Sequence, residues 1–308
     1  MARSIAGLCL AKNEADIIEA MVRHNLGYLD RLHVVDHDSA DATPKILAAL
    51  AAEFPGRLTW ESDAIRGYVQ AAITNARLRP LLAETGAAQV VVVDADEFIR
   101  AEPQHFRDSL LASEVPVLLP WVTYVPTGAD DRAEPNPVAR IIHRREKERP
   151  QVVKSTVPAG IGRRARISQG NHTVSGFSGG PAVQIDGLSL AHFPVRSCEQ
   201  LTSKVLIGVW NIRLRGQLGR SEALQWQKLY DQIMEGDALT EADLQEVAVN
   251  YAARRSVGLI ADPLPGASGV TLKYTPDSAT NLIRNLAAFT EGCVRRLEET
   301  AQDQGPAL

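Results

Sequence analysis

The segment from Val90 to Ile99 constrains the fold of this chain more than any other stretch of the sequence. Four consecutive valines are followed at once by acidic residues, of which Asp94 and Asp96 come first. An unbroken β-branched run is typical of a central strand in a parallel sheet, because both faces of such a strand are buried. Ligands of open α/β sheets bind at the carboxyl ends of the strands. We therefore expect both aspartates to reach one binding site.

The type and spacing of these acids favour a divalent cation. Asp94 and Asp96 offer two hard oxygen donors, which suit Mg²⁺ or Mn²⁺, and a cation there would neutralise a diphosphate. A simpler alternative is that the acids cap a following helix. A cap requires one acid, whereas three acids, completed by Glu97, occur within four residues. The metal site is therefore the favoured interpretation.

The residues before this segment alternate between strand and helix patterns. Strands are expected over residues 4–11, 32–35, 58–60 and 90–93, and helices over residues 17–26, 44–50 and 68–82. We expect Asn13 to cap the first helix and Thr43 to cap the second, with Pro44 as its first helical residue. Strands and helices that alternate with short links predict an α/β fold whose parallel sheet is covered on both faces.

The regular alternation of expected strands and helices ends after Phe98. A helix is expected over 103–111, strands over 115–122, 138–143, 152–157 and 188–194, and mostly helix from Glu199 onward. The strands at 138–143 and 152–157 are expected to pair. Between them, the alternating charges of residues 144–149 indicate a solvated turn.

The overall charge and the cysteines exclude several classes of protein. With a net charge of -4 and a pI near 6.0, the chain has no basic field, so binding of duplex nucleic acid is not expected. Its three cysteines are far apart and lack CxxC spacing, which favours a reducing, cytoplasmic environment. No stretch approaches the roughly 20 apolar residues of a transmembrane helix. The oligomeric state stays open, since the apolar stripes after Ser221 would suit either the core or a second subunit.

Several phosphate chemistries share a sheet-edge Asp-x-Asp. In aspartyl-phosphate phosphatases the motif is usually on the first strand, whereas Asp94 follows the fourth expected strand. Nucleotidyltransferases and dinucleotide oxidoreductases should show a glycine-rich loop after a strand, and residues 12–14 contain no glycine.

Several motifs in order resemble the family 2 glycosyltransferases, most closely the subgroup with a DADEF-type metal motif. They are residues 11–14, 35–43 and 93–98, followed by 170–172 and 191–200 with Lys204. The resemblance covers roughly residues 4 to 210.

This resemblance implies a Rossmann-like glycosyltransferase A fold, with a mostly parallel central sheet and an added helical C-terminal region. Residues 1–210 would form the catalytic domain, with the nucleotide bound by 1–100 and the acceptor and metal site completed by 101–210. Residues 211–308 would form the helical region. The implied activity is the metal-dependent, inverting transfer of a sugar from a nucleoside diphosphate to an acceptor hydroxyl. The acceptor is unspecified: a glycan, lipid-linked molecule, peptide or small molecule.

The resemblance also implies roles for particular residues. Asp94, Asp96 and His192 would bind Mn²⁺ or Mg²⁺, although a buried histidine bonded to the backbone is an equal alternative for His192. Arg196 and Lys204 would offset diphosphate charge. The residues expected to bind the nucleotide sugar are Lys12, Asn13, Glu14, Asp36, Asp38, Gln70, Asp94, Ala95, Arg196 and Lys204.

Inversion requires a general base near the acceptor hydroxyl. The candidates are His172, Asp130, Asp131 and Glu134, and the sequence does not choose among them. Two other functions stay open: a metal-dependent nucleotidyl or phosphoryl transferase, and a nucleotide-sugar-binding protein without turnover.

Overall fold

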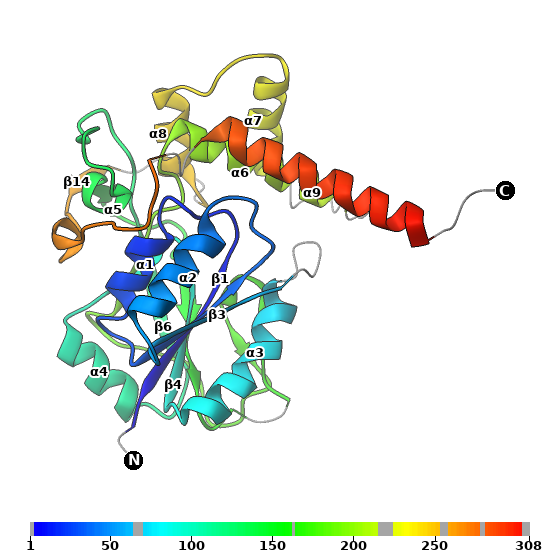
Figure 1. Ribbon diagram of the computed structural model, residues 1–308. Coiled ribbons are helices and arrows are strands. Elements are labelled where there is room, and N and C mark those ends of the chain that lie inside the picture. Colours follow the sequence, from blue (N-terminus) through cyan, green and yellow to red (C-terminus); the bar gives the residue numbers. More distant parts are fainter. Residues whose placement is uncertain are drawn as a thin grey trace.

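The main sheet has the strand order β3-β2-β1-β4-β9 (Figure 1). The computed structural model describes residues 3–63, 70–161, 164–214, 224–252, 258–277 and 281–303. The strands of this sheet are β1 (Ile5–Ala11), β2 (Arg31–Asp36), β3 (Leu58–Ser62), β4 (Gln89–Asp94) and β9 (Val157–Pro158). The first four are parallel and β9 is antiparallel to β4. The expected Rossmann-like α/β architecture is confirmed.

Helices cover both faces of this sheet. They are α1 (Ile18–Asn25), α2 (Thr43–Glu53) and α3 (Gln70–Thr85). Val91 and Val93 pack in one apolar core with residues of α1 and α2, while Val90 and Val92 pack in another with residues of α3. Successive side chains of a strand point to opposite faces. The central, doubly covered strand predicted from the four valines is therefore confirmed.

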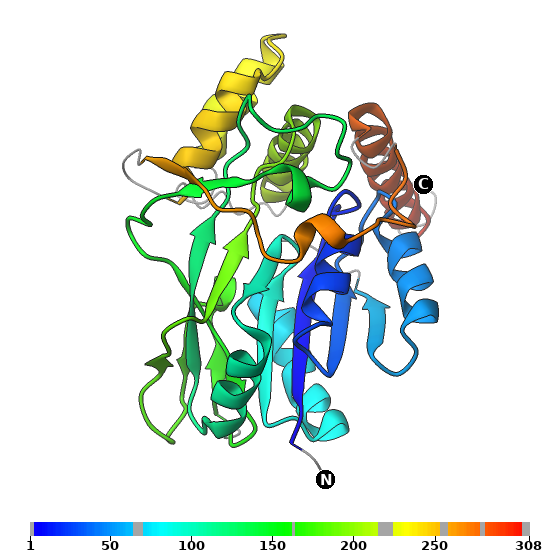
Figure 2. The ribbon, with the colours of Figure 1, turned by 90° about the vertical axis from the view of Figure 1, so that its left-hand side faces the viewer.

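A second, mixed sheet lies beside the first, in green in Figure 2. Its strands are β5 (Glu97–Arg100), β6 (Val117–Thr123), β8 (Val153–Ser155), β12 (Val183–Gln184) and β13 (Ser189–His192). β5 begins directly after the two-residue turn that follows β4, so no helix follows the acids. β13 pairs with both β5 and β6, which places His192 opposite Glu97 and Thr123.

The C-terminal part is largely helical, as expected. Its helices are α6 (Cys198–Leu214), α7 (Leu224–Met234), α8 (Glu241–Asn250) and α9 (Leu282–Asp303). Side chains from α6, α7 and α8 share a core with Val125 and Val195 of the neighbouring sheet region. The far half of α9 extends away from the body (Figure 1). None of the helices in the described ranges is both long and apolar enough to cross a membrane.

Three local expectations in the middle of the chain are wrong. The remaining elements are α4 (Pro103–Ala112), α5 (Pro137–Arg140), β7 (His143–Arg145), β10 (Arg166–Ile167), η1 (Gln169–Asn171), β11 (Val174–Ser175), β14 (Leu259–Ala261) and η2 (Ala267–Gly269). The expected strand at 138–143 starts as α5, because Asn136 caps it and Pro137 suits its first turn. β7 pairs with β14 and β8 with β6, not with each other. Arg145, expected in a solvated turn, is only 3% exposed.

The expected helix caps are also wrong. α1 begins at Ile18 without a side-chain cap, and α2 already includes Thr43. Asn13 adopts a left-handed φ of 56° and accepts a hydrogen bond from the Ala40 N–H, while the Thr43 hydroxyl accepts one from the Glu14 N–H. These side chains join the loops after β1 and β2 instead of capping helices. The expected start of the third helix at residue 68 lies outside the described residues.

A buried carboxylate fastens the C-terminal segment to α1. Glu19 of α1 accepts hydrogen bonds from the N–H groups of Lys273, Tyr274 and Thr275, each at 2.8 Å. It also accepts one from the Arg23 side chain at 2.9 Å. Burial opposes ionisation, but these donors outweigh it and lower the pKa of Glu19. The segment between β14 and α9, orange in Figure 2, is therefore held by charge-assisted hydrogen bonds.

We expect Glu19→Gln to lower the free energy of unfolding by about 3 kcal/mol, because buried N–H donors would then face an amide NH₂. Since the pKa is lowered on folding, the carboxylate stabilises the protein above its unfolded pKa and loses this effect as the pH falls. The gap between variant and wild type should therefore shrink below about pH 4. Urea unfolding above and below about pH 4 checks this, with the exposed Glu84→Gln as control. A constant gap would contradict the assigned ionisation.

Candidate active site

Three parallel strands end at the same edge of the main sheet. Ala11 of β1 lies opposite Asp36 of β2, and Leu10 lies opposite Asp94 of β4. The loop after β1 is tied to the loop after β2, since the Lys12 ammonium donates to the His37 carbonyl at 2.7 Å. The expected juxtaposition of polar strand ends is therefore present in the structure.

The polar side chains after β1 and β2 differ in how far their hydrogen-bonding atoms are already used within the protein. Asp36 is buried, and burial raises its pKa. One Asp36 oxygen accepts the Ser39 N–H, and the other has no partner within the described part of the chain. Asp38 is exposed, with a φ of 54°. Asn13 uses its side-chain oxygen on the Ala40 N–H. Asp36 is thus the residue here that keeps a buried acceptor oxygen without a partner among the described residues.

Side chains from three separate elements hold Asp94. The Gln70 amide of α3 donates to its Oδ1 at 2.6 Å, and Asn171 of η1 donates to the same oxygen at 3.4 Å. Lys154 of β8 binds the other oxygen. Gln70 was expected at the site, whereas Lys154 and Asn171 were not assigned a role from the sequence. The neighbouring Ala95 is buried in the core.

Lys154 was missed because a single lysine within a short expected strand carries no pattern. Its side chain is 1% exposed and lies between two acids, with Nζ 3.2 Å from Oε1 of Glu97. Glu97 also accepts hydrogen bonds from Trp121 Nε1 at 2.6 Å and from the Asp94 N–H at 2.8 Å. Burial raises the pKa of Glu97 to about 8, although Lys154 opposes this shift. Glu97 therefore acts inside the protein and does not face a ligand.

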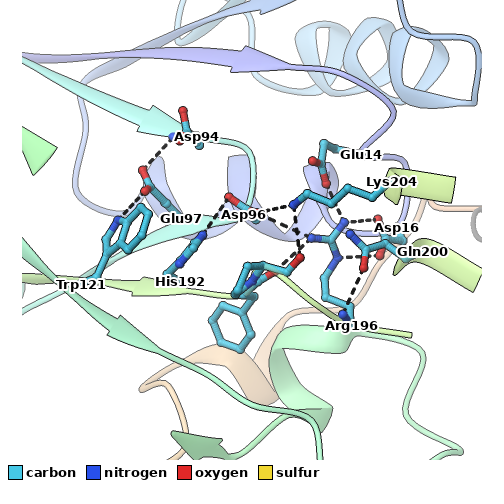
Figure 3. Close-up of polar contacts among 12 residues, drawn as sticks. Glu14, Asp16, Asp94, Asp96, Glu97, Trp121, His192, Arg196, Gln200 and Lys204 are labelled. Carbon is cyan, nitrogen blue, oxygen red and sulfur yellow. Dashed lines mark hydrogen bonds and ion pairs between the residues drawn. The ribbon is translucent and has the colours of Figure 1, made fainter. Parts of the chain in front are cut away.

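Asp96 lies at the centre of the cluster in Figure 3. Its oxygens are 3.7 Å from His192 Nε2, 3.5 Å from Lys204 Nζ and 4.0 Å from Arg196 Nη1. Burial would raise the pKa of Asp96, but Lys204, His192 and Arg196 outweigh it and lower the pKa to about 2. Asp96 is therefore a carboxylate at any working pH.

Burial lowers the pKa of His192 to about 3 although Asp96 opposes this shift, so the imidazole that faces Asp96 is neutral and the low pKa of Asp96 is due to Lys204 and Arg196. Its Nε2 is too far from the Asp96 oxygen for a hydrogen bond, and its Nδ1 has no partner within the described ranges. The ring stacks on Trp121 with centroids 4.0 Å apart. The alternative of a histidine bonded to the backbone finds no support here.

Arg196 is anchored by the loop after β1. Its guanidinium donates to Glu14 at 2.6 Å and to both oxygens of Asp16, at 2.7 and 2.9 Å. Burial raises the pKa of Glu14 to about 7, with Arg196 opposing it. Asp16, which precedes α1, fixes this arginine. Lys204 reaches the Pro194 carbonyl at 3.2 Å, so its ammonium stays beside Asp96.

The four candidate bases fall into two groups. His172 contacts the site region, since its Nδ1 lies 2.8 Å from the Val153 carbonyl and its ring meets Trp121 edge to face. A carbonyl can only accept, so Nδ1 carries the proton and Nε2 is left as an acceptor. In the other group, Asp130, Asp131 and Glu134 accept hydrogen bonds from the N–H groups of Thr127, Ala133 and Asn136, respectively. Those acids order their own loop.

The C-terminal region adds one residue that sequence reasoning missed. Tyr251, just after α8, has its ring 5.3 Å from the ring of His192 and 5.8 Å from Lys204 Nζ. Arg145 of β7 donates to the Tyr251 carbonyl at 2.7 Å and holds this position. No local pattern marks Tyr251, because its neighbours are helix and loop residues far along the chain from Asp96.

The donor set can be compared with what a divalent cation requires. Within the described residues, no three His, Cys, Asp or Glu side chains are grouped as a ready metal site. However, Asp96 and His192 lie 3.7 Å apart and would offer an oxygen and a nitrogen donor to a divalent cation. The wider cluster holds five carboxylates (Glu14, Asp16, Asp94, Asp96 and Glu97) and three cations (Lys154, Arg196 and Lys204). A two-ligand site completed by phosphate oxygens and water fits these residues.

A scan against models of protein families finds no match for this chain, and a search of curated proteins finds none. Among solved structures, it is similar to TarS 1-349 of S. aureus in complex with UDP, with TM-score 0.39 and 12% identity, over 81% of this chain and 70% of that chain. It is also similar to glucosyl-3-phosphoglycerate synthase from Mycobacterium tuberculosis in complex with Mn²⁺, UDP and glucosyl-3-phosphoglycerate. There the TM-score is 0.26 and the identity 23%, over 39% of this chain and 44% of that chain. Likenesses with TM-scores this low do not establish the activity of this chain.

Proposed function

We propose that this chain is a metal-dependent glycosyltransferase that moves a sugar from a nucleoside diphosphate to an acceptor hydroxyl with inversion. The observation that carries the proposal is the pair of Asp96 and His192, 3.7 Å apart at the carboxyl edge of the main sheet, with Lys204 beside them. The order of motifs that resembles family 2 glycosyltransferases supports the same activity.

The donor would lie across the ends of β1, β2 and β4. Asp36 keeps a buried acceptor oxygen for a ribose or base group, and Asp94 is held in place by Gln70 and Lys154. Asp96 and His192 would hold Mn²⁺ or Mg²⁺, which when bound neutralises the diphosphate. Lys204 would stabilise the charge that develops on the leaving diphosphate.

The transfer is a single displacement. The acceptor oxygen forms a bond to the anomeric carbon as the bond from that carbon to the diphosphate oxygen breaks, and the electron pair leaves with the diphosphate. His172 would take the acceptor proton at Nε2, because its Nδ1 proton is directed to Val153. Gly170 permits this arrangement: its φ is 74°, and a Cβ there would lie 2.4 Å from His172 Nε2.

We expect nucleoside diphosphates to raise the melting temperature in a thermal-shift panel only when Mn²⁺ is present. At 100 times Kd, a ligand stabilises by about 2.7 kcal/mol, which corresponds to a shift on the order of 5 °C. One nucleotide should exceed the others and so name the donor. Equal shifts with and without Mn²⁺ would contradict metal-assisted binding.

Product analysis with a labelled nucleotide sugar separates the open alternatives. A glycosyltransferase releases nucleoside diphosphate, whereas a nucleotidyl or phosphoryl transferase retains part of the nucleotide phosphate in another product. A binding protein without turnover would return the donor unchanged in the presence of acceptors.

We expect His172→Asn to lower kcat by about 10² to 10⁴ without a comparable change in the affinity for the nucleotide, because a general base acts only on the acceptor proton. Asp131→Asn is the matched control, since Asp131 serves its own loop. If Asp131→Asn has the larger effect, the base lies in that loop instead.

A further inference from the structure

A pocket of about 360 Å³ lies against β6, beside the reaction centre. Trp121 and Gln151 line it, together with the charged run from Arg144 to Arg149. A volume in this range suits a small molecule or the end group of a larger one.

Positive charge is in excess in this pocket. Arg144 is paired with Asp262 at 2.7 Å, and Glu148 is paired with Arg145 at 2.8 Å. In the described part of the chain, Lys147 and Arg149 have no ion-pair partner. Glu146 is the one carboxylate of the pocket that likewise has none. Two cations against one acid leave a net positive charge for a ligand to neutralise.

Arg145 adds a guanidinium of fixed orientation to the wall of the pocket. Its guanidinium is held at both ends, by Glu148 at Nη1 and by the carbonyls of Ala248 and Tyr251 at Nη2. Although Arg145 is 3% exposed, its Nε has no acceptor among the described residues. A buried guanidinium N–H without an acceptor is unfavourable. Because the guanidinium is held in this way, its positive charge is fixed at the wall of the pocket.

Trp121 connects this pocket to the reaction centre. The same residue lines the pocket, donates to Glu97 at 2.6 Å and stacks on His192 at 4.0 Å. A ligand in the pocket would therefore lie next to the ring that supports the proposed metal ligand.

We propose that this pocket is the acceptor subsite and that the acceptor carries an anionic group, a phosphate or a carboxylate, close to the hydroxyl that receives the sugar. This inference rests on the proposed glycosyl transfer. Arginine and lysine recognise both anions through charge-assisted hydrogen bonds. The volume of the pocket and its unpaired cations favour a small hydroxy acid or phosphorylated alcohol over a neutral sugar.

Calorimetric titration with glycerol phosphate, glycerate and glycerol tests the proposal. We expect wild type to bind one of the two anions and not glycerol, and the better anion identifies the group. Lys147→Ala/Arg149→Ala should weaken this binding at least tenfold, whereas the exposed Lys45→Ala on α2 should not change it. The charge-preserving Lys147→Arg/Arg149→Lys should retain most of the affinity.

Equal binding of the anion by all of these proteins, equal binding of glycerol, or no binding of either anion would each overturn the anionic subsite. These outcomes are separate from the nucleotide and Mn²⁺ thermal shift, which tests the donor site alone. A protein that binds nucleotide with Mn²⁺ but neither anion would keep the proposed function and lose this subsite.

Discussion

Replacement of Asp96 by asparagine is expected to lower sugar transfer at least ~100-fold and to abolish the Mn²⁺-dependent thermal shift. The amide keeps the size of the side chain but removes the charge that a divalent cation needs. It also leaves Lys204, 3.5 Å away, without its carboxylate partner, so the balance of charge around the diphosphate changes.

Release of nucleoside diphosphate from a labelled donor, measured over a range of Mn²⁺ concentrations, checks this expectation. Asp186→Asn is the matched control, because Asp186 is exposed. Near-ultraviolet circular dichroism shows whether the variant is folded. If Asp96→Asn turned over the donor with the same Mn²⁺ dependence as wild type, the metal role of Asp96 would be wrong.

The second large effect concerns stability. We expect Lys154→Met to lower the free energy of unfolding by about 3 to 5 kcal/mol, because it leaves buried charge uncompensated. Methionine matches the lysine stem in size, so the loss reports the ammonium and not a cavity. Lys154 is 1% exposed and contacts both Asp94 and Glu97, and Glu97 is fully buried.

Urea unfolding of Lys154→Met, alone and combined with Glu97→Gln, measures this coupling. At a pH above about 8, where Glu97 is ionised, the double variant should recover part of the lost stability, since one of the two uncompensated carboxylates is gone. The exposed Lys228→Met on α7 is the control. A Lys154→Met variant as stable as this control would mean that Lys154 is not the counter-charge of the cluster.

The strands and helices of the main sheet were predictable because burial leaves a local pattern. The valines of β4 lie in two different apolar cores, as a doubly covered strand requires. The helix caps were not predictable, because Asn13 and Thr43 bond to the loop of a neighbouring strand rather than to their own helix. Whether such a polar side chain caps its own helix or bonds to a distant loop depends on the competition between local and long-range partners, and the sequence shows only the local ones.

The candidate site likewise has a part that could be predicted from the sequence and a part that could not. The polar strand ends at Asp36, Asp94 and Asp96 could be placed at one sheet edge from the sequence, because parallel strands share an edge. The roles of Lys154 and Tyr251 could not, since no spacing links them to Asp96. The role of Asp96 in catalysis stays a prediction, which Asp96→Asn addresses.

The sequence by itself determined the parallel α/β sheet, its central strand and the acidic edge at which a ligand would bind. Only the tertiary structure decided which cations balance those acids, that His192 faces Asp96, and that α8 delivers Tyr251 and anchors Arg145 beside a pocket. The physical reason is the range of each interaction. The periodicity of buried residues can be read from neighbouring positions in the sequence. Charge pairing in a buried cluster depends instead on segments that meet only when β13 pairs with β5 and β8 with β6.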